Sequence, residues 1–239
     1  MNRIRILVIR PIVNVPEELQ QKRLDHLRRL AFSGTEIEIT SIEKGPVAIE
    51  TEYDAALAVP GILRKARQAE KEGFDAIINS CAADPGLYAC RQAVSIPVVG
   101  TGESSHLLAA SLGRKYSIIT VGKQGRIPRL YDNVIRNLNL ESKVASIRGI
   151  GMSSVLELRE NLNKAKKLFI EESKKAIIED GADVIVPGCA YFSELVAELQ
   201  KELEVPIIDP AGAALKMAET LVCLGLTHSK IAFPCPSYI

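Results

Sequence analysis

The sequence predicts an α/β fold built from two similar halves, each with a parallel sheet covered by helices. Short apolar runs of the kind that form buried strands alternate with longer stretches of helical periodicity along the chain. The same order of strands and helices occurs in the first part of the chain and again in the second. Strands that alternate with helices in this way favour parallel sheets with helices on both faces.

The first half is predicted to contain three strands and two helices. The expected order is a strand at residues 4–9, a helix at 16–31, a strand at 36–42, a helix at 62–72 and a strand at 75–78. The strand at 36–42 alternates isoleucine with polar residues, which is typical of a strand with one solvated face. Pro60 is expected to begin or kink the helix at 62–72, and Gly73 to close it.

The second half repeats this order. The expected elements are a strand at residues 116–121, a helix at 127–138, a strand at 143–147, a helix at 162–179 and a strand at 183–186. Gly181 is placed to close the longer helix. No long linker separates the halves, and a chain of 239 residues forms one large domain or two small ones.

The repeat extends to individual residues. Glu72-Gly-Phe-Asp-Ala-Ile-Ile-Asn-Ser-Cys-Ala82 aligns with Asp180-Gly-Ala-Asp-Val-Ile-Val-Pro-Gly-Cys-Ala190 at a constant offset (189 − 81 = 108). Downstream, Ser95-Ile-Pro-Val-Val-Gly100 corresponds to Glu204-Val-Pro-Ile-Ile-Asp209. A duplication that produced two similar α/β units explains this pattern.

The repeat places Cys81 and Cys189 at equivalent positions, each just after the carboxyl end of a buried strand. Ligands bind at that end in open α/β sheets. A helix is expected a few residues later, with Asp84 as N-cap and Pro85 as first residue in one half, and Ser193 as N-cap in the other. Because helix N-termini lower the pKa of a nearby thiol and bind anionic oxygen atoms, both cysteines are candidates for chemistry.

The other three cysteines have simpler interpretations. Cys90 shares a helix face with Leu87 and Val94, and Cys223 lies among leucine and valine residues, so both are expected in the core. Cys235 lies in a tail between prolines, where the sequence favours neither role. A duplicated structural cysteine would give the same symmetry as a duplicated functional one, so symmetry alone leaves both interpretations open.

Two thiols that face one substrate have a defined chemistry. One thiolate removes a proton from a carbon atom, the opposite thiol returns a proton to the other face, and the stereocentre inverts. Reaching one carbon from both sides at ~3–3.5 Å would put the sulfur atoms roughly 6–7 Å apart. Placed acid/base groups contribute ~10²–10⁴-fold, and helix-end N–H groups suit an enolate-like intermediate. Such a reaction requires neither a metal nor a pyridoxal cofactor.

Composition excludes several other classes. The formal net charge is +1, and no basic cluster predicts binding to nucleic acid or to a membrane surface. No apolar run approaches the ~20 residues of a membrane span, so the expected compartment is the cytoplasm. Five cysteines without a CxxC pair, and three scattered histidines, favour neither a disulfide scaffold nor a metal site.

The segments around these cysteines resemble the cofactor-independent aspartate/glutamate racemase superfamily over essentially the whole chain. Cys81-Ala-Ala-Asp-Pro-Gly-Leu87, Gly100-Thr-Gly-Glu103 and Leu112-Gly-Arg-Lys-Tyr-Ser-Ile-Ile-Thr120 are similar to its hydantoin racemase branch, which includes allantoin racemases. The resemblance implies two pseudo-symmetric flavodoxin-like halves, residues 1–100 plus 210–239 and residues 101–209, with the active site in the cleft between them. It also implies a small-molecule substrate, no cofactor and a homo-oligomer.

The resemblance also assigns roles to residues. Cys81 and Cys189 become the acid/base pair. The expected substrate-binding positions are Arg10, Asn14, Ala82, Ala83, Glu103, Thr120, Gly188, Ala190 and Tyr191, with Ala82, Ala83, Ala190 and Tyr191 acting through the amides around them.

Two departures from the superfamily pattern bear on the substrate. The chain has Cys-Ala-Ala at the first cysteine where amino-acid racemases usually have Cys-Asn-Thr, which argues against a free amino acid. The usual Asn-Pro-Asn-Thr/Ser after the first strand is replaced by Arg10-Pro-Ile-Val-Asn14. Arg10 is therefore a candidate for binding an anionic group of the substrate, and equally an ordinary arginine at a strand end.

The expected activity is racemisation of a carbon acid next to a carbonyl, in a 5-substituted hydantoin or a similar compound. One alternative is another reaction of the superfamily, such as amino-acid racemisation, decarboxylation or isomerisation. A non-enzymatic two-lobed ligand-binding protein and a thiol redox protein are alternatives from other classes. The lack of a CxxC pair speaks against the redox protein.

Overall fold

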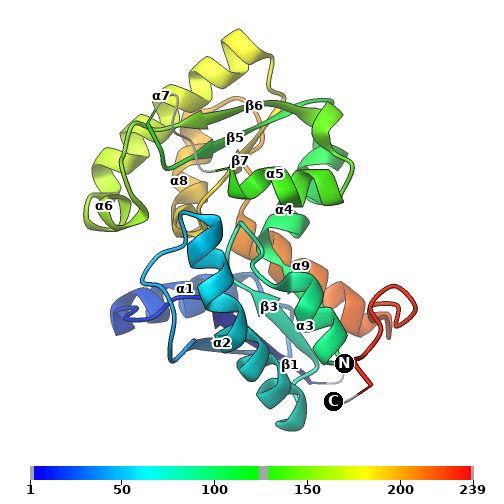
Figure 1. Ribbon diagram of the computed structural model, residues 1–239. Helices are drawn as coiled ribbons and strands as arrows, with labels where there is room; N and C mark the ends of the chain where they lie inside the picture. The colour runs from blue at the N-terminus through cyan, green and yellow to red at the C-terminus, as the bar shows by residue number, and fades with distance from the viewer. Residues whose placement is uncertain (1–2, 124–128, 238–239) are drawn as a thin grey trace. The chain divides into compact units, whose positions relative to one another are not determined.

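The computed structural model describes residues 3–123 and 129–237 and divides into two compact units. The first unit comprises Met1–Thr101 and Ala214–Ile239, and the second comprises Gly102–Ala213. Each unit contains a parallel sheet with helices around it (Figure 1). The α/β class with parallel sheets that the sequence predicts is confirmed.

The sheet of the first unit has four parallel strands in the order β2-β1-β3-β4. The elements are β1 Ile4–Arg10, α1 Glu17–Leu30, β2 Thr35–Ser41, α2 Glu52–Lys71, β3 Ala76–Asn79, α3 Leu87–Ala93 and β4 Val98–Gly100. The central strands β1 and β3 are almost entirely buried, because helices cover both faces of the sheet. Helix α1 contacts β2, and α2 contacts α3. Because crossovers between parallel strands are right-handed, this strand order places α1 on one face and α2 and α3 on the opposite face.

Helix α2 begins ten residues earlier than the sequence predicts. Thr51 caps it, since the Asp54 N–H donates to the Thr51 side chain (3.2 Å) and the Thr51 N–H donates to the Asp54 carboxylate (3.0 Å). This reciprocal capping box is a strong helix start. Pro60 lies inside the helix at an exposed position. The helix continues through it because apolar packing on both sides outweighs the hydrogen bond that the proline cannot donate.

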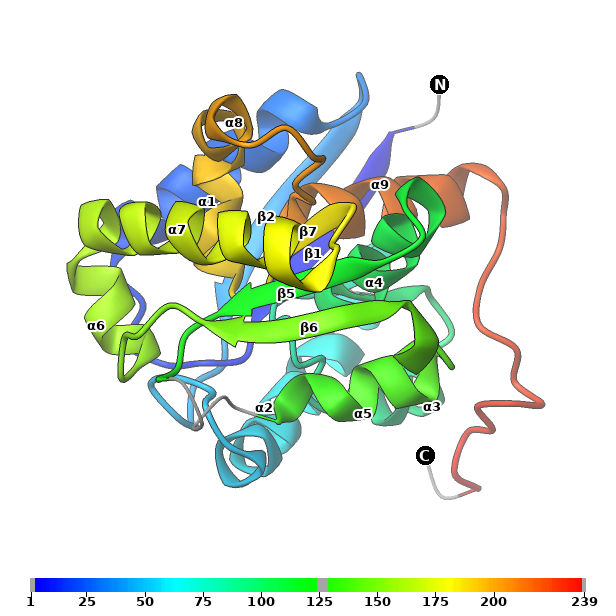
Figure 2. The ribbon, with the colours of Figure 1, turned by 90° about the horizontal axis from the view of Figure 1, so that it is seen from above.

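The sheet of the second unit has three parallel strands in the order β6-β5-β7. The elements are α4 Thr101–Leu112, β5 Tyr116–Thr120, α5 Leu130–Asn137, β6 Val144–Gly149, α6 Val155–Glu160, α7 Leu162–Asp180, β7 Val184–Pro187 and α8 Val196–Leu199, with 3₁₀ turns at Glu141–Lys143, Ala190–Leu195 and Gln200–Glu202. Helix α7 lies on one side of this sheet and α5 on the other (Figure 2). The first residues of the helix predicted at 127–138 lie outside the described residues.

The internal repeat is visible in the backbone hydrogen bonds of the two units. In the first, Asp75 N–H donates to the Arg5 carbonyl (2.8 Å) and its carboxylate accepts the Arg5 N–H (2.7 Å). In the second, Asp183 makes the same pair of bonds with Lys115 (2.9 and 3.0 Å). These matched aspartates directly precede β3 and β7, so the sequence repeat corresponds to a structural one.

The second unit also carries a trace of a fourth strand. A single parallel bridge joins Ile185 to Ile207, in the place that β4 occupies beside β3 in the first unit. The Ile185 N–H donates to the Pro206 carbonyl and the Ile77 N–H to the Pro97 carbonyl, both at 2.9 Å. The two sheets therefore share one topology, with the outer strand reduced to one bridge in the second unit.

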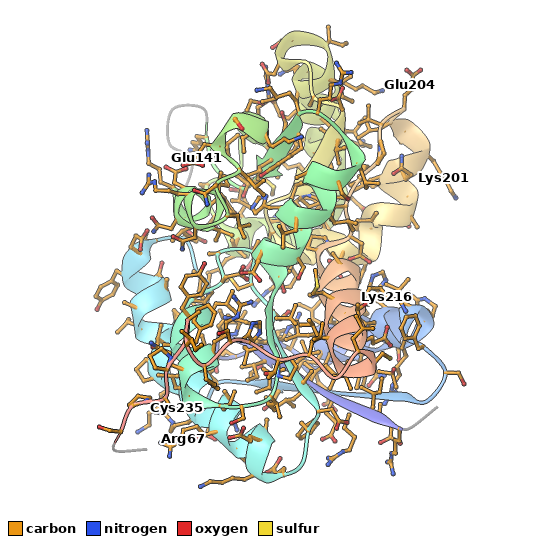
Figure 3. The ribbon with its side chains drawn as sticks, turned by 90° about the vertical axis from the view of Figure 1, so that its right-hand side faces the viewer. Arg67, Glu141, Lys201, Glu204, Lys216 and Cys235 are labelled. Carbon is orange, nitrogen blue, oxygen red and sulfur yellow. The ribbon has the colours of Figure 1, made fainter. Side chains whose placement is uncertain are left out.

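Helix α9, Pro210–Cys223, ends in the first unit and is tied there by a buried carboxylate. Glu219 is fully buried and accepts the Phe32 N–H and the Thr35 hydroxyl, both at 2.7 Å. Lys216 donates to the same carboxylate (2.8 Å), and its ammonium lies 3.7 Å from the centroid of the Phe32 ring (Figure 3). These donors compensate the burial of the charge and fix α9 beside the α1–β2 connection.

The tail after α9 covers the outer edge of β4 and the end of α3. His228 Nε2 lies 3.1 Å from the Val98 amide nitrogen, on the open side of the edge strand. The Lys230 ammonium donates to the carbonyls of Arg91 (2.7 Å) and Val94 (2.5 Å) at the C-terminus of α3. A cation there is favourable for the helix dipole, and a covered edge strand is protected against pairing with another chain.

Among the helices of residues 3–123 and 129–237, none has both the length and the apolarity needed to cross a bilayer.

Candidate functional site

Cys81 lies in a tight turn that follows β3. The Ser80 N–H donates to the Ile9 carbonyl (2.9 Å), so the chain stays in register with β1 for one residue beyond the strand. The Cys81 N–H then donates to the Asn79 carbonyl and the Asp84 N–H to the Cys81 carbonyl, both at 3.0 Å. The thiol is half-buried. It sits at the carboxyl end of a central strand, where ligands bind in such sheets.

Asn79 supports this turn and was not identified from the sequence. It is fully buried, its Nδ2 donates to the Pro85 carbonyl (2.8 Å), and its own carbonyl accepts the Thr101 hydroxyl (2.7 Å). Its Oδ1 is buried without a hydrogen-bond partner among the described residues. A polar side chain at the end of an apolar strand was the available signal, because buried polar groups require partners.

Asp84 does not cap the following helix as predicted. Helix α3 begins at Leu87, and its N-cap residue is Gly86. Asp84 has a φ of +47°, in the left-handed region, and is buried with its carboxylate against Gly100, where an added Cβ would overlap it. The left-handed residue prolongs the turn after Cys81 and delays the helix by several residues.

The turn leaves two backbone donors available beside Cys81. Ala82 is buried and Ala83 half-buried. In the part of the chain that the structure describes, the N–H groups of these two alanines have no hydrogen-bond acceptor. Such groups can stabilise negative charge that develops on a substrate oxygen.

Arg10 and Asn14 occupy different environments in the first unit. Arg10 ends β1, is buried with 5% of its surface exposed, and follows the strand residue that pairs with Asn79. Asn14 is exposed and has a φ of +54°, which asparagine tolerates better than most residues. Arg10 therefore lies at the strand end that carries Cys81, whereas Asn14 lies four residues farther along the loop.

Cys189 follows β7 in the second unit as Cys81 follows β3 in the first. The Gly188 N–H donates to the Ile119 carbonyl (2.8 Å), the counterpart of the bond between Ser80 and Ile9. The segment beyond it differs, because Cys189 has an extended backbone (φ −137°, ψ 127°) and the 3₁₀ turn begins at once with Ala190. The Cys189 side chain is half-buried and packs against the core of this unit.

Ser193 and Tyr191, which follow Cys189, lie in different environments. Ser193 is not the N-cap of a helix there, because it lies inside the 3₁₀ turn and its hydroxyl accepts the Ala211 N–H (3.1 Å) at the start of α9. The Ser193 hydroxyl thus bonds an N–H group that is distant in the sequence, instead of one in the turn that follows Cys189. Tyr191 is half-buried and packs against the same core as Cys189.

Thr120 and Gly188 are brought together by a residue that the sequence did not identify, Tyr131. The Tyr131 hydroxyl donates to the Gly188 carbonyl (2.5 Å) and lies 2.7 Å from Thr120 Oγ1. All three residues are buried. Tyr131 is on α5, outside the repeated segments, and the sequence pattern carries no signal for its contact with a residue 57 positions away.

Glu103 lies in the first turn of α4 and is half-buried. Helix α4 begins at Thr101, directly after β4, so Ser104, Ser105 and His106 also lie within it.

The remaining cysteines are of two kinds. Cys90 is fully buried, as predicted, and burial raises the pKa of its thiol to about 12. Cys223 was expected in the core but is exposed, because it lies at the last residue of α9. Cys235 is exposed in the tail (Figure 3). Within the described residues, no three His, Cys, Asp or Glu side chains are grouped so that they could hold a metal ion.

Comparison with known proteins identifies related sequences over nearly the whole chain. The model of the Asp/Glu/Hydantoin racemase family matches residues 6–218. A hydantoin racemase from Pseudomonas sp. (strain NS671) is 37% identical over 211 residues, which cover 88% of this chain and 84% of that protein. A hydantoin racemase from Rhizobium meliloti is 34% identical, with 91% and 89% covered.

Solved structures of racemases also match this chain. The allantoin racemase from Klebsiella pneumoniae matches with a TM-score of 0.90 at 31% identity, covering 98% of this chain and 94% of that one. A glutamate racemase from Bacillus anthracis matches with a TM-score of 0.65 at 18% identity, covering 96% and 91%, and so shares the fold alone.

Proposed function

The chain belongs to the Asp/Glu/hydantoin racemase family and is a racemase, and from this premise we propose that it inverts the stereocentre of a 5-substituted hydantoin or a similar ring compound. The proposed reaction uses Cys81 and Cys189 as the two acid/base groups and requires no cofactor. The reacting carbon lies next to a carbonyl, which makes its proton removable by a thiolate.

The observation that carries this proposal is the equivalence of the two strand ends. Ser80 and Gly188 make the same backbone hydrogen bond to the neighbouring central strand, and a half-buried cysteine follows each. Cys90 lies inside helix α3 and not at a strand end. Burial raises the pKa of its thiol to about 12, so the thiol stays protonated at neutral pH. Of these three cysteines, the two at strand ends are the ones suited to proton transfer.

In the proposed mechanism, one thiolate removes the proton from the carbon and leaves an enolate-like intermediate. Negative charge develops on the neighbouring carbonyl oxygen, and the N–H groups of Ala82 and Ala83 are suited to receive it. The second thiol then donates its proton to the opposite face of the carbon. The reverse reaction exchanges the roles of Cys81 and Cys189, which suits a substrate and product that are mirror images.

Two features of the first unit favour a ring amide over a free amino acid. Cys81 is followed by two alanines, whose side chains offer no partner for an ammonium group or a carboxylate. Arg10 is a buried cation at the same end of the sheet, which would repel an ammonium group and attract a carbonyl or a deprotonated ring nitrogen. The other proposed substrate contacts are Asn14, Glu103, Ala190 and Tyr191.

The test follows proton exchange at the stereocentre. Each enantiomer of a 5-substituted hydantoin and of allantoin is incubated in deuterium oxide with wild type, Cys81→Ser and Cys189→Ser. Wild type is expected to racemise at least one substrate with uptake of deuterium, measured by circular dichroism and proton NMR. Each serine variant is expected to lose racemisation, because a serine hydroxyl is a much weaker acid than a thiol.

Cys223→Ser is the matched control, since it makes the same change at an exposed position on α9. It is expected to keep wild-type activity. Full racemisation by Cys81→Ser or Cys189→Ser would refute the two-cysteine mechanism. Inactivity of wild type on every hydantoin, with activity on an amino acid, would refute the substrate and favour the alternative within the family.

Three further expectations from the sequence stay predictions. They are a homo-oligomer, a cytoplasmic location, and two halves that divide at residues 100 and 210. Light scattering, cell fractionation and limited proteolysis are the respective measurements.

A further inference from the structure

Gly188, the residue before Cys189, is held through both of its backbone polar groups by buried partners of the second unit. On one side, the Gly188 N–H donates to the Ile119 carbonyl of β5 (2.8 Å). On the other, the Gly188 carbonyl accepts the Tyr131 hydroxyl (2.5 Å). This carbonyl belongs to the peptide that joins Gly188 to Cys189. Its orientation therefore sets the direction in which the Cys189 side chain leaves the backbone.

The direction of the hydrogen bonds follows from proton counting. A tyrosine hydroxyl has one proton, and Tyr131 gives it to Gly188, whose carbonyl can only accept. Thr120 Oγ1, which lies 2.7 Å from the same hydroxyl, must then be the donor in its bond to Tyr131. The result is a directed chain from Thr120 through Tyr131 to the Gly188 carbonyl. Such chains strengthen each member and fix its orientation.

Close packing adds a further constraint on Gly188. A Cβ added at Gly188 would lie 2.6 Å from Thr120 Cβ and 2.7 Å from its Oγ1, so the Gly188 backbone lies directly against Thr120. The equivalent residue in the first unit is Ser80, which carries a side chain. The contact between Gly188 and Thr120 is thus a property of the half that carries Cys189.

We propose that Tyr131 is a positioning residue for Cys189, and that Thr120 acts through it. This inference rests on the proposed role of Cys189 in proton transfer. Tyr131 fixes the peptide between residues 188 and 189, and Thr120 orients the Tyr131 hydroxyl. Thr120 is 1% exposed, which suits this supporting role. A thiol that must reach one carbon atom depends on such support, because a misplacement of about 1 Å can cost ~10²-fold in rate.

The experiment compares Tyr131→Phe with Tyr116→Phe. Both variants lose one hydroxyl from a buried tyrosine of the second unit and keep the ring. The Tyr116 hydroxyl is buried without a hydrogen-bond partner among the described residues, so its removal is a matched control. The first readout is the rate at which iodoacetamide alkylates Cys81 and Cys189, resolved by mass spectrometry over a pH series. The second is kcat and KM for racemisation.

Tyr131→Phe is expected to change the alkylation rate of Cys189 by ~2–10-fold, the range that corresponds to one lost hydrogen bond. The pH profile of Cys189 should shift, whereas Cys81 should keep its rate and profile. The kcat should fall by ~10–100-fold with KM nearly unchanged. Tyr116→Phe should leave both readouts at wild-type values.

Thr120 gives an independent arm if Tyr131→Phe does not fold. Thr120→Val removes the donor and should reproduce the change at Cys189, whereas Thr120→Ser keeps a hydroxyl and should restore it. An unchanged Cys189 profile in folded Tyr131→Phe or Thr120→Val, or equal changes at both cysteines, would overturn the proposal. Alkylation is measured without substrate, so a wrong substrate assignment would leave this test intact.

Discussion

At the scale of single residues, His106 is buried in an environment that does not favour its charged form. Its side chain is 2% exposed, and its Nδ1 has no hydrogen-bond partner among the described residues. Its ring centroid lies 5.4 Å from that of Tyr116, which is also buried. Burial lowers the pKa of His106 to about 4, from an ordinary value of 6.5.

This pKa predicts that the protein loses stability as the pH falls below neutral. Between pH 6.5 and about pH 4 the unfolded chain binds a proton at His106 that the folded protein does not bind. The free energy of unfolding should therefore fall by ~2 kcal/mol from pH 7 to pH 5 through this residue. His106→Phe removes the titrating group at similar volume and should flatten that part of the profile. Urea denaturation at several pH values measures the free energy of unfolding. If this free energy depends on pH in the variant as it does in wild type, His106 is not the titrating group.

At the scale of secondary structure, the start of α2 depends on a local signal. The hydroxyl and carboxylate of the Thr51–Asp54 capping box satisfy two N–H groups at the first turn. Thr51→Ala should lower the free energy of unfolding by ~1 kcal/mol. Thr220→Ala is the control, because the exposed Thr220 hydroxyl bonds only the Lys216 carbonyl of its own helix (2.7 Å). Chemical denaturation compares the two. Equal losses would mean that the cap does not contribute.

The fully buried strands were predictable from sequence and several neighbouring elements were not, for physical reasons. β1, β3, β5 and β7 lie within a residue or two of their predicted bounds, because strands buried on both faces are continuously apolar. β4 has three residues, which are too few to show the alternation of apolar and polar residues that is typical of a strand. Pro60 indicates a helix start near residue 62, whereas the Thr51–Asp54 capping box sets the true start of α2.

Some features of the candidate site were likewise predictable from the sequence, and others were not. The positions of Cys81 and Cys189 after matched strands followed from the repeat. The role of Asn79 could have been suspected, since it interrupts an apolar strand end. The contact between Tyr131 and Gly188 joins residues 57 positions apart, and it depends on how α5 packs against the sheet. No local pattern encodes such packing, so only a structure reveals it.

At the scale of the whole molecule, the duplication has produced two units that are equivalent in topology and different in detail. Cys81 lies in a turn with a left-handed residue, and Arg10 is buried at the same strand end. The backbone of Cys189 is extended, and the Tyr131 hydroxyl donates to the carbonyl of the preceding residue, Gly188. The two proposed acid/base groups therefore have unlike surroundings, although the reaction proposed for them connects mirror images.

Thermodynamics and this asymmetry together make a prediction about the kinetics. The equilibrium constant between two enantiomers is one, so kcat/KM must be equal in the two directions for wild type and for any variant. The separate values of kcat and KM, and the deuterium isotope effects on kcat, should differ between the directions, because in the proposed mechanism a different thiol removes the proton in each. Initial rates with each pure enantiomer, protonated or deuterated at the stereocentre, measure this. Identical kcat, KM and isotope effects in both directions would show that the two thiols act in equivalent surroundings, contrary to the unlike turns around Cys81 and Cys189.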